Sequence, residues 1–274
     1  MPIALRADRA VFRFSGPDAQ KLLNDVVTGI VKAEPGPARW WALLSAQGKI
    51  QAEGLIGFAD DALWLDVHES VADDFFKRMR MYKLRAQVTI DDLRASHRVG
   101  WSEEPVSEGI VHADVRATDL GYRVIAPVEA TDDWTADASG YVAARVAEAI
   151  AEQGADFAAD TTFAHDIGMD ILDGIDFSKG CYVGQEVVSR MKHRGTARRR
   201  PVLVTGNGLV PGAPLLVDGR ESGTVGSVAG ERAVGIVRLD RVTDPMAVTA
   251  GEAPATLALP TWASYAFGES APSE

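Results

Sequence analysis

The sequence is very poor in cysteine, with Cys181 as its single thiol among 274 residues. One thiol cannot form a disulfide within its own chain, and it cannot by itself build a cysteine-ligated metal site. The composition therefore excludes a disulfide framework and favours a reducing compartment.

Long apolar runs and an excess of basic residues are also missing. No stretch of about 18 apolar residues, as a membrane-spanning helix requires, occurs in the chain. Residues 1–9 lack the apolar segment of a secretory signal peptide. A formal net charge of −11 argues against a surface built as a whole for nucleic acid or an anionic membrane. These absences predict a cytoplasmic protein with no membrane partner, for which nucleic acid is an unfavoured ligand.

Several common site motifs are absent as well. The chain has no phosphate-binding P-loop and no Gly-x-Gly-x-x-Gly after a strand. Its five histidines show no paired spacing such as i, i+4, and its acidic clusters lack the glycine and terminal glutamate of a calcium loop. The sequence therefore predicts no metal site.

Apolar periodicity predicts an α+β fold followed by a separate β unit. Helical patterns follow Asp18 and cover residues 71–82 and 141–153, with Gly154 as the stop of the last helix. Strand patterns cover residues 38–45, 49–58, 62–68, 85–90 and 122–128. After Arg200, short β-type runs separated by glycine and proline indicate a small barrel or sandwich with its boundary near residue 199.

Charge is unevenly distributed along the chain. Residues 143–176 contain eight acidic residues and one base, whereas residues 190–200 contain six basic residues and no acid. A basic segment on an acidic protein can bind a carboxylate or phosphate. Alternatively, it is a solvated helix end that pairs with the preceding acids, and charge alone favours this second interpretation.

The surroundings of Cys181 are those of a site more than of a core. Gly180 and Gly184 permit a sharp turn or a close backbone approach, and residues 185–192 have helical character, so we expect Cys181 just ahead of a helix N-terminus. Free N–H groups there, together with Lys179, would favour the thiolate, which is the form that attacks electrophiles or binds metal. A small buried hydrophobe is the structural alternative for a lone cysteine.

Glu186, Arg190 and Arg194 are spaced four residues apart and would share one helix face. Such a face could hold a ligand carboxylate through a bidentate guanidinium contact. Each feature alone has a structural explanation, since an exposed Glu–Arg pair contributes only about 0.2–1 kcal/mol. Because the cysteine, the two glycines and the charged residues all fall between residues 179 and 194, the sequence favours a functional site over a purely structural segment.

The segment Lys179-Gly180-Cys181-Tyr182-Val183-Gly184-Gln185-Glu186, followed by Arg190 and Arg194-Gly195, closely resembles the signature of YgfZ-type folate-binding proteins. These proteins belong to the superfamily of the glycine-cleavage aminomethyltransferase. The resemblance implies three lobes in a ring around a central hole that holds a reduced folate, with two α+β lobes, the first one discontinuous, and a C-terminal β-barrel. Applied here, the first lobe is 1–46 with 135–198, the inserted α+β lobe is 47–134, and the barrel is 199–274.

The resemblance also implies a function, namely tetrahydrofolate-dependent support of the assembly or repair of iron–sulfur clusters in client enzymes. Tetrahydrofolate or a one-carbon-substituted folate would be the cofactor, a cluster would be held only transiently, and the partners would be iron–sulfur assembly proteins and client enzymes. By position, Cys181 is the functional thiol, with Lys179 as its activating neighbour. Folate contacts fall to Tyr182, Gln185, Glu186, Arg190 and Arg194.

Two other functions stay open. A folate-dependent one-carbon transferase is one, although the aminomethyltransferase's own counterpart of the cysteine motif is absent, which argues against classical aminomethyl transfer. An RNA-binding module using Arg190–Arg200 is the other, and its binding would fall steeply with salt. The chain also departs from the family at Gly29, because an acidic residue commonly follows the threonine that stands here as Thr28.

Overall fold

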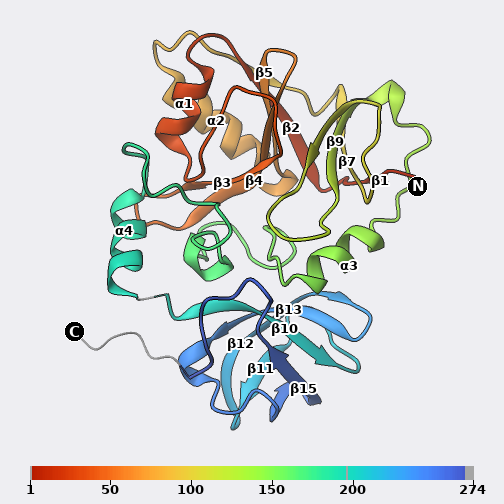
Figure 1. The fold of residues 1–274 in the computed structure, drawn as a ribbon, viewed down its shortest axis with the longest axis vertical. Coiled ribbons are helices and arrows are strands. Elements are labelled where there is room, and N and C mark those ends of the chain that lie inside the picture. Colours follow the sequence, from red (N-terminus) through yellow and green to blue (C-terminus); the bar gives the residue numbers. More distant parts are fainter. Residues whose placement is uncertain (1, 196, 269–274) are drawn as a thin grey trace.

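The computed structural model describes residues 2–195 and 197–268, with only the backbone described for Arg194. Three β-sheets organise the chain into three lobes (Figure 1). The first sheet has the order β3-β4-β5-β2-β6, the second has the order β1-β7-β9-β8, and the third is a closed barrel with the order β10-β13-β12-β11-β14-β15. The predicted fold class, α+β lobes followed by a small C-terminal barrel, is confirmed.

Two helices cover one face of the first sheet. Phe12 and Phe14 project from the inner strand β2 and pack with Leu23 and Phe75 from the two helices, and all four are almost fully buried. The elements of this lobe are β2 (Arg9–Ser15), α1 (Ala19–Val26), β3 (Arg39–Leu44), β4 (Ile50–Ala59), β5 (Ala62–His68), η1 (Glu69–Val71), α2 (Ala72–Lys83) and β6 (Thr89–Asp92).

The second sheet packs beside the first through a small apolar cluster. Val11 and Trp64 of the first sheet contact Val99 and Ile125 of the second. This lobe contains β1 (Ala4–Leu5), β7 (His97–Ser102), β8 (Ile110–Ala113), β9 (Tyr122–Pro127), η2 (Val128–Ala130) and α3 (Ser139–Ala147).

The barrel begins at Arg199, at the predicted boundary. Its strands are β10 (Arg199–Gly206), β11 (Pro214–Val217), β12 (Arg220–Ala229), β13 (Arg232–Arg238), β14 (Val248–Ala250) and β15 (Ala253–Ala258), with η4 (Leu239–Arg241) after β13. The first four of these were predicted from the sequence. The last two were not, since β14 has only three residues and β15 carries a single β-branched residue, Thr256.

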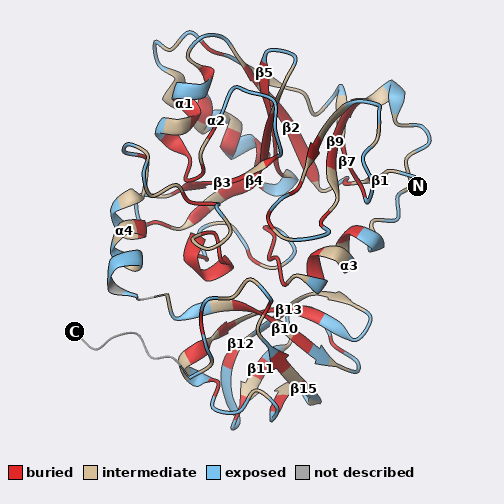
Figure 2. Ribbon diagram, in the orientation of Figure 1, coloured by how far each residue is buried: buried red, intermediate tan, exposed pale blue. Residues whose placement is uncertain are grey.

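The segment between α3 and the barrel runs from the centre of the molecule, where η3 lies, to its edge, where α4 lies (Figure 1). It includes η3 (Ala164–Ile167) and α4 (Gln185–Arg194) and covers the second face of the first sheet. Ile167, Met169 and Tyr182 of this segment pack against Trp40 and Leu44 of β3, in a cluster that also reaches the barrel at Val234. Figure 2 shows the short central helix η3 as buried. The cysteine segment is thus fixed between the first lobe and the barrel.

The helix predicted over residues 141–153 is shorter than expected. It ends at Ala147, and Ala149 has a φ of 51°, in the left-handed region that interrupts a helix. The strand predicted over residues 85–90 instead occupies Thr89–Asp92. Neither difference changes the order of elements.

The sheets suggest lobe boundaries that differ from the predicted ones. Residues 46 and 47 lie in the turn between β3 and β4, which are hydrogen-bonded neighbours in one sheet. A boundary there would divide that sheet, so we propose to keep residues 9–92 together as one lobe. None of the helices in the described residues is long and apolar enough to cross a membrane.

Candidate functional site

The turn that presents Cys181 is shaped by the carboxylate of Asp176. Its Oδ1 accepts hydrogen bonds from the main-chain N–H groups of Ser178 at 2.8 Å and Lys179 at 3.3 Å, and from the Ser178 hydroxyl at 2.6 Å. Burial would raise the pKa of Asp176, but these bonds and the charge of Lys179 hold it below the ordinary value. An ionised Asp176 therefore fixes the turn at neutral pH.

Lys179 attaches this turn to the loop that follows α1. Its Nζ donates hydrogen bonds to the carbonyl oxygens of Val27 and Gly29, the second at 2.7 Å. Burial lowers the pKa of Lys179 to about 8, although the charges of Asp176 and Asp25 oppose this shift. The amine is therefore held by two backbone acceptors, and it loses its proton more easily than an ordinary lysine.

Thr28 holds the same two segments together from within the core. Its buried hydroxyl donates to the Gly174 carbonyl at 2.7 Å and accepts from the Ala42 N–H at 2.9 Å, and its own carbonyl accepts from the Asp176 N–H at 2.9 Å. The adjacent Gly29 has no room for a side chain, because a Cβ there would lie 2.2 Å from the Trp40 carbonyl oxygen. This contact explains why glycine follows the threonine here.

The two glycines that flank Cys181 differ in their surroundings. Gly184 is closely packed at the start of α4, whereas Gly180 borders open space. Gly184 caps the helix with a φ of 82°, and a Cβ there would lie 2.8 Å from the Ser45 carbonyl oxygen. A Cβ at Gly180 would meet nothing within 4 Å. Cys181 lies between the two, just ahead of the helix as predicted, and its thiol is exposed. The alternative of a buried cysteine is therefore wrong.

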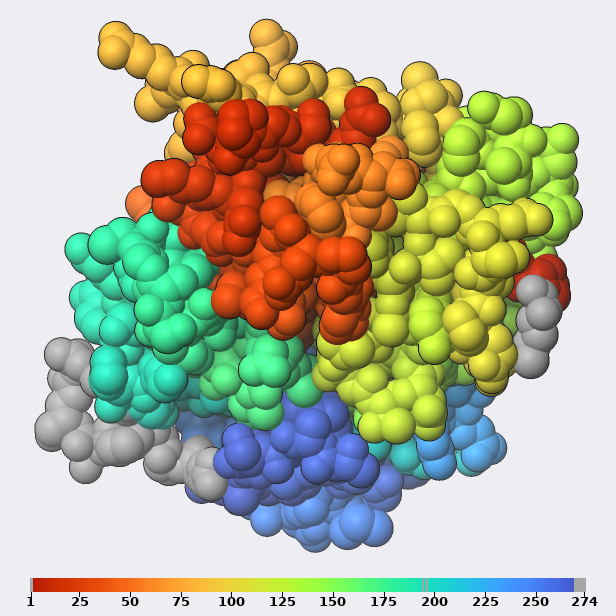
Figure 3. Space-filling model, turned by 45° about the horizontal axis from the view of Figure 1, so that its top comes forward, coloured from red at the N-terminus to blue at the C-terminus, as the bar shows by residue number. Residues whose placement is uncertain are grey.

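The space-filling view places this segment at the surface. Residues of the Cys181 turn and α4, coloured green to teal, lie between the red and orange first lobe and the blue barrel (Figure 3). A reagent or partner can reach the thiol without any rearrangement of the core.

The remaining predicted site residues fall into two groups, one at least half-buried and one exposed. Tyr182 is 7% exposed and packs in the core, with its ring centre 5.0 Å from the Lys179 Nζ, and burial raises the pKa of its hydroxyl to about 12. Gln185 is half-buried, while Glu186 and Arg190 are exposed. The Arg190 Nε lies 3.4 Å from the Glu186 main-chain oxygen that accepts its hydrogen bond. The Arg194 side chain lies outside the described residues.

A buried ion-pair network, which we call the junction network, lies where the lobes meet, and no local pattern in the sequence marks it. Arg9 Nε donates to Asp66 at 2.8 Å, Arg6 Nη2 donates to Glu152 at 2.8 Å, and Arg123 Nε lies 3.2 Å from Asp66. The buried members of the network are four arginines and four carboxylates, Arg6, Arg9, Arg123, Arg145, Glu53, Asp66, Glu152 and Asp156. Arg6 also pairs with the partly exposed Asp8 at 2.7 Å.

The junction network balances its own charges and connects all three lobes. Burial would raise the pKa of Glu152, but the surrounding arginines hold it well below the ordinary value. Arg145 reaches the barrel through the Ser227 hydroxyl, and Glu53 accepts from the Trp40 indole at 2.8 Å. Because its members span residues 6–156, only the fold brings them together.

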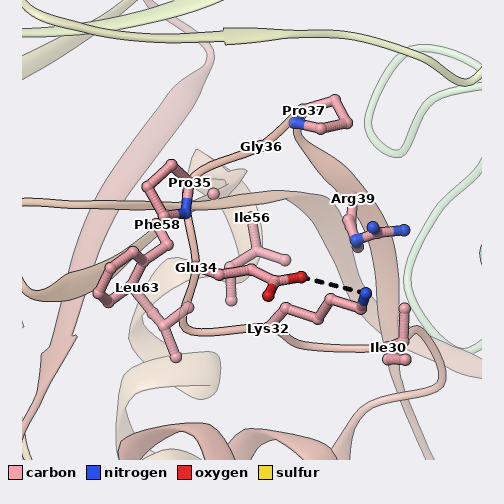
Figure 4. Close-up of a pocket in the computed structure, with 11 residues that line it drawn as sticks. Ile30, Lys32, Glu34, Pro35, Gly36, Pro37, Arg39, Ile56, Phe58 and Leu63 are labelled. Atoms are coloured by element: carbon pink, nitrogen blue, oxygen red, sulfur yellow. Dashed lines mark ion pairs between the residues drawn. The ribbon is translucent and has the colours of Figure 1, made fainter.

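A small cavity lies beside β3, between the loop at residues 30–37 and the strands β4 and β5 (Figure 4). Apolar side chains such as Phe58 and Leu63 line it together with Arg39 and the ion pair of Lys32 with Glu34 at 3.1 Å. Its volume of about 80 Å³ is well below the 300–1,000 Å³ or so of small-molecule sites. It is therefore too small to hold a folate in this conformation.

The predicted basic run does not form one continuous face. Arg200 is bound to Asp170 through two hydrogen bonds of 2.6 and 3.0 Å, whereas Arg198 and Arg199 are exposed at the start of β10. Among the basic side chains of residues 190–200 that the structure describes, pairing with the preceding acids thus accounts for Arg200 alone. Within the described part of the chain, no group of three histidine, cysteine, aspartate or glutamate side chains is placed to hold a metal ion.

The fold is similar to the crystal structure of glycine cleavage system aminomethyltransferase T from Bartonella henselae, with a TM-score of 0.74. The match covers 97% of this chain and 87% of that chain at 14% sequence identity, so it shows the fold alone. Residues 198–265 match the family model described as CAF17, C-terminal beta-barrel domain. The protein therefore has an aminomethyltransferase-like fold, and its C-terminal barrel is of the CAF17 type.

Sequence comparison relates the chain to a more specific group of proteins. The chain is 30% identical to the mitochondrial iron–sulfur cluster assembly factor IBA57 homolog of Pyricularia oryzae, over 70% of this chain and 54% of that protein. It is 29% identical to the homolog of the same name from Chaetomium globosum, over 84% of this chain and 62% of that protein. The chain is homologous to these assembly factors and spans a little over half their length.

The predicted cytoplasmic location is contradicted by these relatives, whose names point to the mitochondrion. The prediction rested on composition and on the first residues of the chain. Neither feature identifies a compartment, because a reducing environment and a soluble composition are not unique to the cytoplasm.

Proposed function

We propose that this chain is an accessory factor for the assembly or repair of iron–sulfur clusters, with Cys181 as its functional thiol. The observation that carries the proposal is an exposed thiol on a turn held rigidly by Asp176, Lys179 and Thr28. The homologous assembly factors support this role. Within this class, the signature around Cys181 favours the YgfZ type.

The geometry limits what Cys181 can do with a cluster. A protein-bound cluster takes about four ligands in most cases, and this chain supplies one thiol. Cys181 would therefore contribute one ligand in a complex in which a partner or small molecule supplies the others. An exposed position beside the open space at Gly180 suits such a shared complex.

Folate is the proposed cofactor, and the predicted contact residues can bind only one part of this molecule. Exposed Arg190 and half-buried Gln185 offer polar partners for the anionic tail. Tyr182 is packed in the core and cannot provide a wall for the flat pterin ring. The residues of the signature therefore offer contacts for the anionic tail of folate, but they offer no surface for its pterin ring.

A complementation experiment tests the role of the thiol. Cells that lack this protein would receive the wild-type chain, Cys181→Ser, or the control Gln47→Ala, which alters an exposed side chain in the turn between β3 and β4. We expect the activity of cluster-dependent enzymes to be restored by the wild type and the control but not by Cys181→Ser. Full restoration by Cys181→Ser would overturn the proposal.

Calorimetric titration tests the cofactor separately. We expect tetrahydrofolate to bind the wild-type chain and Arg190→Gln to bind it more weakly, because the arginine would meet the glutamate tail. Absence of binding to the wild type would remove folate from the proposal and leave the role of the thiol intact.

A further inference from the structure

A second cavity, separate from the signature, lies where the first lobe, the central segment and the barrel meet. Its volume is about 380 Å³, which is within the usual range of small-molecule sites. None of the residues from 179 to 186 lines it. The lining residues are Lys49, Thr161, Phe163, Asp166, Met191, Arg198, Arg199 and Arg238.

Four of these side chains are basic and one is acidic. Arg199 and Arg238 are directly opposite each other on the paired strands β10 and β13. Like charges in this position destabilise a sheet, and the bond from Arg238 to Asp240 at 2.6 Å offsets only one of them. An anion in the cavity would relieve the remaining repulsion.

Lys49, directly before β4 in the first lobe, adds a further charge to the cavity. Its Nζ donates to the Thr161 carbonyl at 2.9 Å and lies 3.3 Å from the centre of the Phe163 ring. Burial lowers the pKa of Lys49, and the charge of Arg199 lowers it further, while Asp166 opposes the shift. The positive groups of the cavity thus influence one another at short range.

We propose that this cavity binds a small organic anion carrying several phosphate or carboxylate groups. Arginine forks bind such groups in a bidentate manner, and lysine binds them as a point charge. Nearly buried Asp166, whose Oδ2 accepts from the Phe163 N–H at 3.1 Å, selects a ligand that also carries a hydroxyl or amino donor. The site is independent of the function assigned to Cys181.

Calorimetric titration with citrate and with pyrophosphate, at low salt and at about 0.15 M salt, tests the proposal. We expect at least one probe to bind with a Kd below about 1 mM, more weakly at the higher salt, and the tighter probe assigns the ligand class. Arg198→Gln with Arg199→Gln should weaken binding about tenfold or more, whereas Cys181→Ser should bind like the wild type.

Arg80→Gln with Arg85→Gln is the matched control, because it removes the same charge from exposed arginines outside the cavity. Lys49→Gln, which changes a lining residue of the first lobe, is a second test if the double arginine variant folds poorly. Failure of both probes to bind the wild type, or an equal loss in the control and the cavity variants, would overturn the proposal.

Discussion

The turn that carries Cys181 and the junction network both contain several polar and charged side chains. They differ in whether these side chains are paired inside the protein or left exposed. The network pairs four arginines with four carboxylates inside the protein. The turn buries its anchors, Thr28 and part of Lys179, and leaves the thiol exposed. The comparison separates polar groups that are fully paired inside the protein from an exposed thiol on a supported turn, and the proposed function requires the second arrangement.

The largest expected effect is on stability at the junction network. Arg9→Met leaves Asp66 and Glu53 buried without their main partner, so we expect the free energy of unfolding to fall by about 3–5 kcal/mol. The surface pair of Arg13 with Asp91 provides the control, since Arg13→Met should cost about 1 kcal/mol or less. Urea unfolding measures both, and equal losses would contradict the distinction between the two pairs.

A smaller loss is expected at the anchor of the turn. Thr28→Val leaves the Gly174 carbonyl and the Ala42 N–H without their buried partner, which costs about 1–3 kcal/mol. Hydrogen exchange should quicken at residues 174–180, because the turn loses its attachment to the first lobe. Thr243→Val, which removes an exposed hydroxyl, should change neither quantity. Unchanged exchange in Thr28→Val would show that other contacts hold the turn.

The pH dependence of stability should reveal Lys179. Its pKa is about 8 in the folded protein and near 10.5 when unfolded, so the unfolded chain binds more protons between these values. Its contribution to the free energy of unfolding should therefore rise with pH from about 8 to about 10.5 and be constant below this window. Subtracting the pH profile of Lys179→Met isolates this contribution. A flat difference across the window would mean that Lys179 titrates alike in both states.

Much of the fold could be predicted from the sequence, because its patterns are local. The strands β3, β4 and β5 and the first four barrel strands show apolar patterns bounded by turn residues, and all were predicted. Strand β2 was missed because it begins with a short apolar run, Ala10-Val11-Phe12, and only Phe12–Ser15 alternate, which is too short to assign a strand by periodicity alone. The helix α3 was predicted too long because Ala149 and Ile150 continue its apolar pattern, whereas the backbone leaves the helix after Ala147 and Ala149 has a φ of 51°.

The candidate site was predictable in its residues but not in its geometry. The spacing of Gly184 and the helical residues after it placed Cys181 ahead of α4. The partners of Lys179 could not be predicted, because they are backbone carbonyls about 150 residues away, and no side-chain pattern marks them. For the same reason, the sequence did not predict that Tyr182 is buried in the core while Cys181, its neighbour, is exposed.

The effect of Cys181→Ala, measured as unfolding temperature and as support of cluster-dependent enzymes in the same cells, tests the central claim most directly. Because the thiol is exposed and Gly180 beside it faces open space, we expect an unfolding temperature within about 2 °C of the wild type. The activity of the cluster-dependent enzymes should fall to the level of cells without the protein. A variant that loses stability but keeps this activity would show that Cys181 is a structural residue and contradict the account.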